Sequence, residues 1–389
     1  MIVTMESHTN QPTSTDRAAA AHIVIDARNM PTSTGRYVEM LVRYLEKIDS
    51  EHRYSILMYP DKMDKWQPTN PNFAAVPCPH REFSFGEQLG LKRQIDRLQP
   101  DLVHFSMVQQ PIFYRSSPVV TTMHDLTTIR FRNPAKNWLV FNIKRLIYIL
   151  VNHVAARKSR RVITPTDFVR RDVAHFTRVS ADKITYTHEA VDDFDEPEQV
   201  MPSFEGKRFI MFNGRPTPHK NLHRLIDAFA ILHQQDPDLY LMLAGKVDES
   251  YDSYVQQIQS LGLAERVVLT DFIPDGQLKW AMRHCQAYIW PSLSEGFGLP
   301  PLEAMLHGAP VVSSNASCMP EVLGNAAHYF DPKDTKAMAR AIQDVLHDAQ
   351  LRDTLTAKGK EQVRRYSWER MAKQTLDIYN DILDKKRTL

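Results

Sequence analysis

The most informative segment of this chain is EGFGLPPLEAM, residues 295–305. It follows a short apolar run, residues 287–290, which predicts a buried strand. The proline pair inside the stretch is typical of the first turn of a helix, because the N–H that proline lacks has no partner there anyway. Gly308 and the proline two residues later predict the end of that helix, and residues 310–313 predict the next strand. The stretch therefore predicts a strand, a glycine loop, a short helix and another strand.

Two carboxylates flank this predicted turn, because Glu295 opens it and Glu303 lies eight positions later on the predicted helix. In an open α/β sheet, the loop that follows a strand faces the ligand crevice. Free N–H groups at a helix start favour an anion, and glycine lets the backbone approach that anion. Backbone amides can bind a phosphate, and carboxylates can accept hydrogen bonds from pairs of hydroxyls. The turn therefore suits a polyhydroxylated ligand that carries phosphate. Two solvated acids beside a tight turn are the alternative interpretation.

Apolar runs of strand length recur in both halves of the chain and alternate with segments of helical spacing, which predicts βαβ units and parallel sheets. In the first half these runs cover residues 23–26, 54–58, 102–105, 119–123 and 162–164. In the second half they cover residues 208–212, 240–245, 267–269, 288–290 and 311–312. Two such series in tandem predict an α/β protein with two Rossmann-like domains facing a cleft.

The expected domain boundaries follow from changes in composition and hydrophobic periodicity along the chain. An acidic stretch with proline and no clear period, residues 191–206, predicts a linker. We therefore expect an N-terminal domain over 21–190, a C-terminal domain over 207–366 and a closing helical segment over 367–389. Residues 1–20 are polar and lack the apolar core of a signal peptide, so we interpret them as a disordered tail.

The composition narrows the function classes. The chain of 389 residues is 43% hydrophobic and 24% charged, with a formal net charge of only +2, and nothing in this balance argues for nucleic acid as a partner. The three cysteines lie far apart and offer neither metal spacing nor a disulfide framework, which favours a cytoplasmic location. No uninterrupted apolar run reaches the roughly 18 residues of a membrane span.

Charge is unevenly distributed, because residues 129–183 hold 13 Lys and Arg against 3 Asp. Inside this basic region lies an apolar segment, residues 138–150. One interpretation is a core helix with a solvated basic edge, which we favour for the apolar residues. The other is peripheral contact with a membrane, in which the region meets anionic lipid headgroups or a lipid-phosphate acceptor.

The segment between Glu295 and Glu303 resembles the E-x7-E motif of retaining glycosyltransferases with the GT-B fold, in particular the large family 4 (GT4). The resemblance implies that Glu295 lies by the donor sugar and that Glu303 binds the ribose of the nucleotide. It also places the intervening residues Phe297, Gly298 and Leu299 in the donor site. In GT-B proteins the closing helices cross back onto the first domain, so the same path is expected for residues 367–389.

A second glycine and proline loop follows the first strand of the C-terminal domain and carries Arg215 and Lys220. Departure of a nucleoside diphosphate requires stabilisation of its negative charge, and an Arg with a Lys can supply this without a metal. Family 4 members use an Arg and a Lys in the equivalent loop in this way. Two basic residues on a solvated loop are the alternative. Since no Asp-x-Asp motif follows a strand, no metal or cofactor is expected.

Four further positions enter through the resemblance. His124 follows a strand of the N-terminal domain where family members have a His-Asp pair near the donor sugar, and it is a second candidate catalytic residue. A histidine that hydrogen-bonds a turn is the alternative. Gly35 resembles the glycine loop near the donor phosphates. Gly245 lies where the family lines the nucleotide pocket, and Ile273 lies where it holds the base.

These features predict a retaining, metal-independent hexosyltransferase that uses a nucleotide diphosphate sugar and glycosylates a hydroxyl of a glycan or a lipid-linked acceptor. The His-Asp-Leu sequence at His124 resembles that of members that use GDP-mannose, which favours mannose, and UDP- or dTDP-linked sugars remain open. One rival is a non-catalytic sugar-nucleotide-binding protein or inactive partner subunit. The other is an NAD-linked oxidoreductase, against which the incomplete dinucleotide fingerprint counts, since its third glycine position is Pro301.

Overall fold

The structure is a computed structural model. It describes residues 20–387, apart from 31, 33–34, 83, 133–137 and 247–250. The predicted disordered tail therefore lies outside the described residues, except for its last residue.

The N-terminal half is built on a seven-stranded sheet in the order β3-β2-β1-β4-β5-β6-β7, and every pairing in it is parallel. Its strands are β1 (His22–Asp26), β2 (Arg53–Met58), β3 (Phe73–Pro77), β4 (Leu102–Phe105), β5 (Val119–Thr122), β6 (Arg161–Thr164) and β7 (Ile184–Tyr186). Its longer helices are α1 (Arg36–Ile48), α2 (Lys92–Leu98), α4 (Trp138–Lys158) and α5 (Asp167–Thr177). Short turns of helix add η1 (Pro60–Lys65), η2 (Gly86–Leu91), α3 (Thr127–Arg130) and η3 (Ala181–Lys183).

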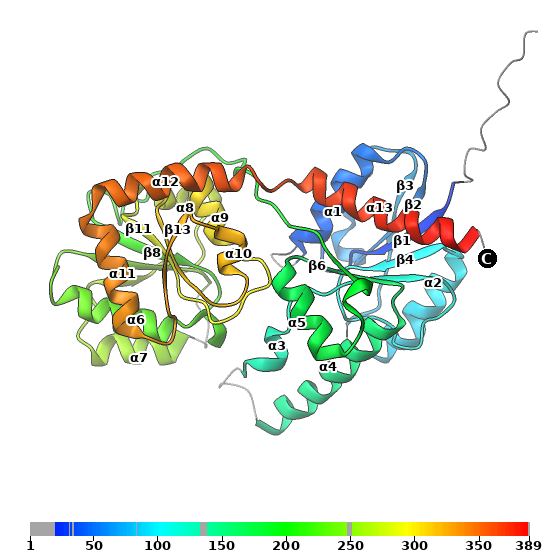
Figure 1. The fold of residues 1–389 in the computed structure, drawn as a ribbon, viewed down its shortest axis with the longest axis horizontal. Coiled ribbons are helices and arrows are strands. Elements are labelled where there is room, and N and C mark those ends of the chain that lie inside the picture. The colour runs from blue at the N-terminus through cyan, green and yellow to red at the C-terminus, as the bar shows by residue number, and fades with distance from the viewer. Residues whose placement is uncertain are drawn as a thin grey trace, which may run out of the picture.

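The C-terminal half has a six-stranded parallel sheet in the order β10-β9-β8-β11-β12-β13. Its strands are β8 (Phe209–Asn213), β9 (Tyr240–Ala244), β10 (Val267–Leu269), β11 (Ala287–Trp290), β12 (Val311–Ser314) and β13 (Ala327–Phe330). Its helices are η4 (Pro218–Lys220), α6 (Leu222–His233), α7 (Asp252–Ser260), α8 (Asp275–His284), α9 (Leu299–Leu306), α10 (Met319–Leu323), α11 (Thr335–His347) and α12 (Ala349–Val363). Figure 1 shows the two halves side by side, each with helices around its sheet.

Both sheets confirm the predicted fold class, α/β with two Rossmann-like domains. The strands β4, β5, β11 and β12 are buried along their whole length, as expected for parallel strands with helices on both faces. The strand order reverses between β1 and β4 in the first sheet and between β8 and β11 in the second. Ligands of such sheets bind outside the carboxyl ends of strands at these reversal points. The loops after β8 and β11 are therefore neighbours.

The last helix, α13 (Trp368–Arg387), leaves the C-terminal half and lies against α1 of the N-terminal half (Figure 1). Trp368, Met371 and Tyr379 are buried in the same apolar cluster as residues of α1 and β1. The Tyr379 hydroxyl also lies 2.5 Å from Nδ1 of the buried His104. Because α13 packs on α1 and β1, the chain connects the two halves a second time, in addition to the linker between them.

Helix α4 corrects one expectation. The sequence favours a core helix for residues 138–150, and the structure shows that this prediction is wrong, because none of them is buried. The buried residues of α4 are all in its second half: Val151, Asn152, Ala155 and Ala156. By length and composition α4 is also long and apolar enough to cross a membrane, although no uninterrupted apolar run in the sequence is. The apolar part of α4 projects from the domain, at the bottom of Figure 1.

Candidate active site

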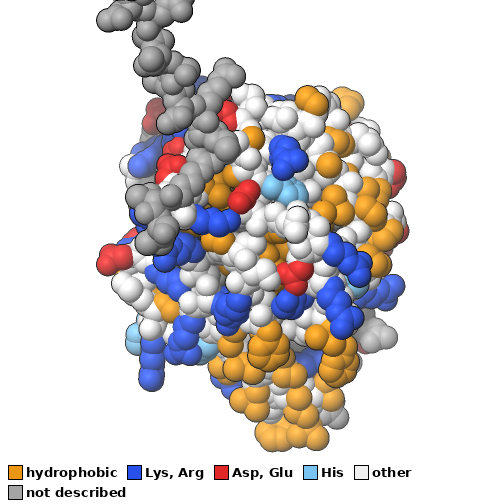
Figure 2. All heavy atoms as spheres, turned by 90° about the vertical axis from the view of Figure 1, so that its right-hand side faces the viewer, with side chains coloured by type: hydrophobic (Ala, Val, Ile, Leu, Met, Phe, Trp, Pro, Cys, Tyr) orange, Lys and Arg blue, Asp and Glu red, His pale blue; other side chains and the backbone are white. Residues whose placement is uncertain are grey.

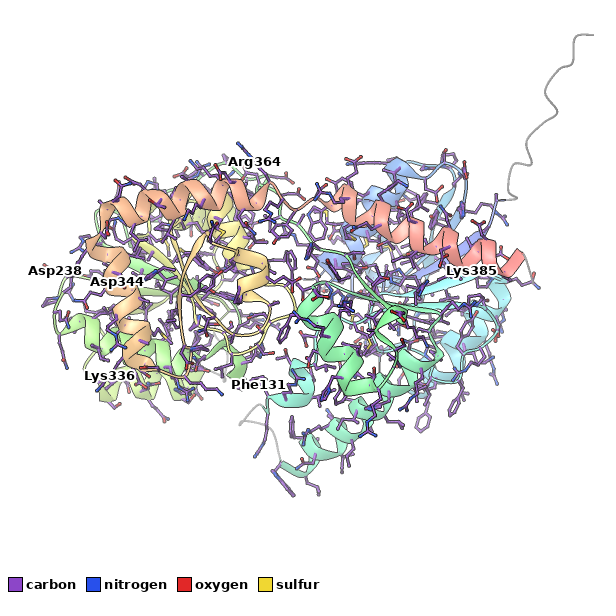
Figure 3. All side chains as sticks on the ribbon, in the orientation of Figure 1. Phe131, Asp238, Lys336, Asp344, Arg364 and Lys385 are labelled. Carbon is purple, nitrogen blue, oxygen red and sulfur yellow. The ribbon has the colours of Figure 1, made fainter. Side chains whose placement is uncertain are left out.

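The candidate site lies where strand-end loops of the two halves touch. A Cβ atom on Gly296 would lie only 2.2 Å from the carbonyl oxygen of His124, so the two backbones meet there and only glycine fits. The Thr166 hydroxyl donates to the Gly296 carbonyl oxygen over 3.0 Å. At the edge of this contact the rings of Phe131 and His219 are 5.9 Å apart, and Figure 3 labels Phe131 below the junction. The halves are thus closed on each other.

The loops after β8 and β11 bring Lys220 and Glu295 together, as the sheet order requires. Lys220 Nζ lies 2.7 Å from Glu295 Oε1, and the two side chains are only 14% and 11% exposed. The Lys220 ammonium also lies 4.2 Å from the centre of the Trp290 ring, a cation–π contact. A poorly solvated cation and carboxylate at the ends of two strands form a site for a polar, charged ligand.

Both partners of this pair are held by their own loops. Asn221, which follows Lys220, adopts a left-handed conformation, and its side chain donates to the carbonyls of Pro291 and Pro332 over 3.0 and 2.8 Å. The Glu295 N–H donates to the Ser317 hydroxyl over 3.1 Å. The buried Cys318 thiol contacts the Glu295 carbonyl oxygen at 3.3 Å, and burial raises the pKa of this thiol, so it stays a donor. The geometry of the pair is therefore preorganised.

Glu303 pairs across the junction instead. It lies on α9 and forms an ion pair with Arg36, the first residue of α1 in the other half. Burial raises the pKa of Glu303, the Arg36 guanidinium opposes that rise, and nearby Asp275 adds to it. Sequence reasoning missed Arg36. The feature that could have identified Arg36 is its position directly after Gly35, at the start of the helix that follows β1.

Arg215 is exposed on the loop after β8, and within the described part of the chain its side chain makes no ion pair or hydrogen bond. The structure thus brings Lys220 and Glu295 together and leaves the Arg215 guanidinium available on the same loop. Its neighbour Gly214 has a φ of +147° and lies close to Gly245, where an added Cβ would be 2.5 Å from the Gly214 carbonyl oxygen. The ends of β8 and β9 therefore approach closely beside Arg215.

The His124 ring is hydrogen-bonded within its own half. Its Nδ1 lies 3.4 Å from Glu189 Oε1, and its Nε2 lies 3.1 Å from the carbonyl oxygen of Ser106. Burial acts to lower the pKa of His124, but the hydrogen bond and charge of Glu189 outweigh burial, and the pKa is raised. With acceptors at both nitrogens the imidazolium form fits best. His124 can offer a ligand positive charge, and its partner Glu189 could not be selected from any motif in the sequence.

The remaining predicted residues would contact a ligand mainly through their backbone atoms. Phe297 and Ile273 are buried in the core of the C-terminal half, and Leu299 packs against both halves. Gly298 precedes α9 with a φ of +88°, a conformation that favours glycine. A Cβ on Gly35 would lie 2.0 Å from the Asn29 carbonyl oxygen, so this turn also needs glycine. Among the described residues, no group of three or more His, Cys, Asp or Glu side chains could hold a metal ion.

Two families match the chain. Residues 34–193 match Glycosyltransferase Family 4, and residues 193–362 match Glycosyl transferases group 1. The O-antigen chain mannosyltransferase B of Escherichia coli is 29% identical over 283 residues, which cover 69% of this chain and 72% of that protein. The phosphatidyl-myo-inositol mannosyltransferase of Mycobacterium leprae is 32% identical over 177 residues, 44% of this chain and 46% of that protein.

Other relatives are longer. The serotype-specific mannosyltransferase WbdA of Escherichia coli is 29% identical over 229 residues, 56% of this chain, and the match spans only 28% of WbdA. Solved structures share the fold over nearly the whole chain. Sucrose-phosphate synthase from Thermosynechococcus elongatus has a TM-score of 0.75 at 17% identity, covering 94% of this chain and 100% of the other. Anabaena Alr3699/HepE in complex with UDP and glucose has a TM-score of 0.71 at 19% identity, covering 93% and 100%.

Proposed function

This chain belongs to glycosyltransferase family 4 and has the GT-B fold, and from this premise we propose that it transfers a hexose from a nucleotide diphosphate sugar to an acceptor hydroxyl. The observation that carries the proposal is the Lys220–Glu295 pair, formed by the loops after β8 and β11, with the exposed Arg215 on the same loop as Lys220. A cation pair for a diphosphate and a carboxylate for a sugar are what such a donor requires.

The charges suggest how the donor is bound. Without a ligand, the Glu295 carboxylate is the counter-ion of Lys220. A diphosphate carries more negative charge than the Glu295 carboxylate. Lys220 and Arg215 would therefore bind the diphosphate oxygens and stabilise the diphosphate as it leaves. Glu295 would then be free to accept hydrogen bonds from the sugar hydroxyls and to offset positive charge developing at the anomeric carbon. We propose retention of configuration through attack on the same face of the sugar, in line with the family resemblance.

Glu303 is proposed to fix the ribose. Ribose offers two neighbouring hydroxyl donors, and a carboxylate accepts both when it is ionised. Because burial raises the pKa of Glu303, the Arg36 guanidinium is what favours the ionised form. The ribose site would thus be complete only when the two halves are closed.

Mannose is the proposed sugar. Several matched relatives are named as mannosyltransferases that act on O-antigen chains or on phosphatidyl-myo-inositol, which supports a mannosyl donor and a glycan or lipid-linked acceptor. GDP-mannose is the donor to test first, and the UDP in the Anabaena structure makes a UDP-sugar the second. Metal independence and a cytoplasmic location remain part of the proposal, and the three cysteines, all unpaired and buried, fit a reducing compartment.

A thermal-shift screen tests donor binding first. A nucleoside diphosphate at 100 times its Kd stabilises the folded state by about 2.7 kcal/mol, so GDP is expected to raise the Tm, with and without a chelator. Transfer of labelled mannose from GDP-mannose to a glycan or lipid acceptor tests catalysis. Stabilisation by GDP without transfer to any acceptor or to water would identify a non-catalytic binding protein. No response to any nucleoside diphosphate would contradict the proposal.

A further inference from the structure

The N-terminal part of α4 presents an exposed apolar surface. Its exposed large apolar side chains are Trp138, Leu139, Val140, Ile143, Leu146, Ile147 and Leu150. Trp138 and Leu146 are 63% and 66% exposed. These positions span about 20 Å of helix and point in several directions around it, since no residue from 138 to 150 is buried. An exposed apolar surface of this extent marks an interaction site.

Neighbouring elements extend this surface. Phe85, Leu89 and Phe113 are 90%, 56% and 72% exposed. The loop that carries Phe113 is tied to α4, because the Gln109 side chain donates to the Tyr148 hydroxyl over 2.8 Å. The same loop is tied to η2, because the Ile112 N–H donates to the Gln88 side chain over 2.9 Å. Figure 2 shows hydrophobic side chains gathered at the lower end of one face of the molecule, where α4 lies in Figure 1. We call α4 residues 138–150 with these three side chains the apolar surface.

Basic residues adjoin the apolar surface on the same face. From residue 138 to residue 166 the chain has six Lys and Arg and no Asp or Glu. A depression of about 770 Å³ lies beyond the buried end of α4, and Figure 2 shows a band of Lys and Arg above the apolar side chains. Eight basic side chains line the depression against the single acid Asp381: Arg115, Arg157, Lys158, Arg160, Arg161, Lys183, Lys385 and Lys386. This face therefore complements an anionic partner.

We propose that this face docks on the surface of a bilayer that contains anionic phospholipid. The apolar surface would insert among the acyl chains, as interfacial helices do to a depth of about 5–10 Å, and the basic depression would meet the lipid phosphates. Trp138 stands at the end of the apolar part, and tryptophan favours the membrane–water interface. Because Val151, Asn152 and the alanines that follow are buried in the domain, α4 contacts the bilayer only through its projecting part.

The charge pattern favours lipid over a second copy of the chain. Two copies that met through this face would place the basic residues of one against those of the other, and no acid between residues 138 and 166 would offset them. A bilayer supplies both the apolar layer and the negative charge at once. The loop leading to α4 starts at Phe131, beside the junction of the two halves, so docking brings that junction near the membrane.

Sedimentation with vesicles tests the docking without any donor or acceptor, so it stands apart from the proposed function. The full chain is mixed with vesicles of phosphatidylcholine alone or of phosphatidylcholine and phosphatidylglycerol in equal amounts. We expect binding to the mixed vesicles, weakened by added salt. A triple variant should weaken that binding about tenfold or more; it combines Trp138→Ser, Leu146→Ser and Leu150→Ser. The reversal Arg157→Glu with Arg160→Glu is expected to do the same.

Matched controls lie on the C-terminal half. The variant Leu261→Ser removes an exposed leucine there, and Lys333→Glu with Lys336→Glu reverses two exposed charges; Lys336 is labelled far from α4 in Figure 3. Both controls are expected to bind as the parent does. Parent binding retained by the α4 variants would overturn the proposal, as would failure of the folded parent to bind mixed vesicles. It would also be overturned by a concentration-dependent dimer, seen without lipid by sedimentation velocity, that the apolar substitutions dissociate.

Discussion

The two sides of the junction have the same architecture but satisfy their charges differently. On the C-terminal side, Lys220 and Glu295 pair with each other from loops of one sheet, 2.7 Å apart. On the N-terminal side, Arg36 has its ion-pair partner, Glu303, in the other half. The C-terminal side is therefore preorganised by its own fold, whereas the Arg36–Glu303 contact exists only when the halves are closed. Variants on the two sides should differ in effect accordingly.

Glu295→Ala tests whether the preorganised side performs the chemistry. Removal of a carboxylate that acts in the transition state is expected to lower kcat for mannosyl transfer by about 10²–10³-fold. The far-ultraviolet circular dichroism is expected to remain that of the parent, because Glu295 is not part of the apolar core. A variant that keeps near-normal kcat would remove Glu295 from the mechanism.

Lys220→Ala separates donor binding from chemistry. A hydrogen bond to a charged group contributes about 1.5–3 kcal/mol, so GDP affinity measured by calorimetry should fall by about 10–100-fold. The matched control is Lys360→Ala, an exposed lysine on α12 of the same half, which is expected to leave GDP affinity unchanged. Unchanged GDP affinity in Lys220→Ala would show that the diphosphate binds elsewhere.

Arg36→Ala tests the side that depends on closure. Removing one partner of a buried ion pair costs about 3–5 kcal/mol, but Arg36 is 26% exposed, so we expect a loss of about 1–2 kcal/mol of unfolding free energy. The pKa of Glu303 would rise further, and a raised folded pKa means that this loss grows as the pH rises through it. Urea unfolding at several pH values measures it.

The control for Arg36→Ala is Arg43→Ala on the same helix, whose ion pair with Glu39 is exposed and is expected to be worth less than about 0.5 kcal/mol. Equal losses in the two variants at every pH would mean that Arg36 is only another surface charge, and that closure does not depend on it.

The smallest expected effect concerns His124, whose charge is balanced within its own half. Its folded pKa is raised above 6.5, so it contributes stability that is complete below that pH and is lost as the pH rises through the folded pKa. Replacing its partner, Glu189→Gln, is expected to lower the His124 pKa and flatten this dependence. Titration of the His124 ring proton by nuclear magnetic resonance measures it. An unchanged pKa would mean that Glu189 does not hold the proton on His124.

Local sequence patterns were sufficient for most of the fold. The proline pair Pro300–Pro301 lies in the first turn of α9, as the turn chemistry predicts. The strands β3, β7 and β13 at the sheet edges were not predicted. Each is only partly buried, so its apolar pattern is weak, and each depends on pairing with the neighbouring strand.

Contacts across the junction could not be predicted in the same way. The pairing of Lys220 with Glu295 follows from sheet order, which alternating elements and a resemblance suggest. The pairing of Arg36 with Glu303 depends on how two rigid halves close, and no local spacing encodes that. The exposure of residues 138–150 could not be predicted from local sequence either. A run of apolar residues predicts a core helix, and the run itself does not show whether something outside the chain covers that helix.

The central claim is that the turn between β11 and α9, with the loop after β8, binds a nucleotide diphosphate sugar. The most direct measurement is a crystal structure of the chain with bound GDP. We predict diphosphate oxygens within about 3.2 Å of Lys220 Nζ and of the Arg215 guanidinium, with the ribose hydroxyls on Glu303. A nucleotide bound away from Lys220, with the Lys220–Glu295 pair unchanged, would contradict the claim.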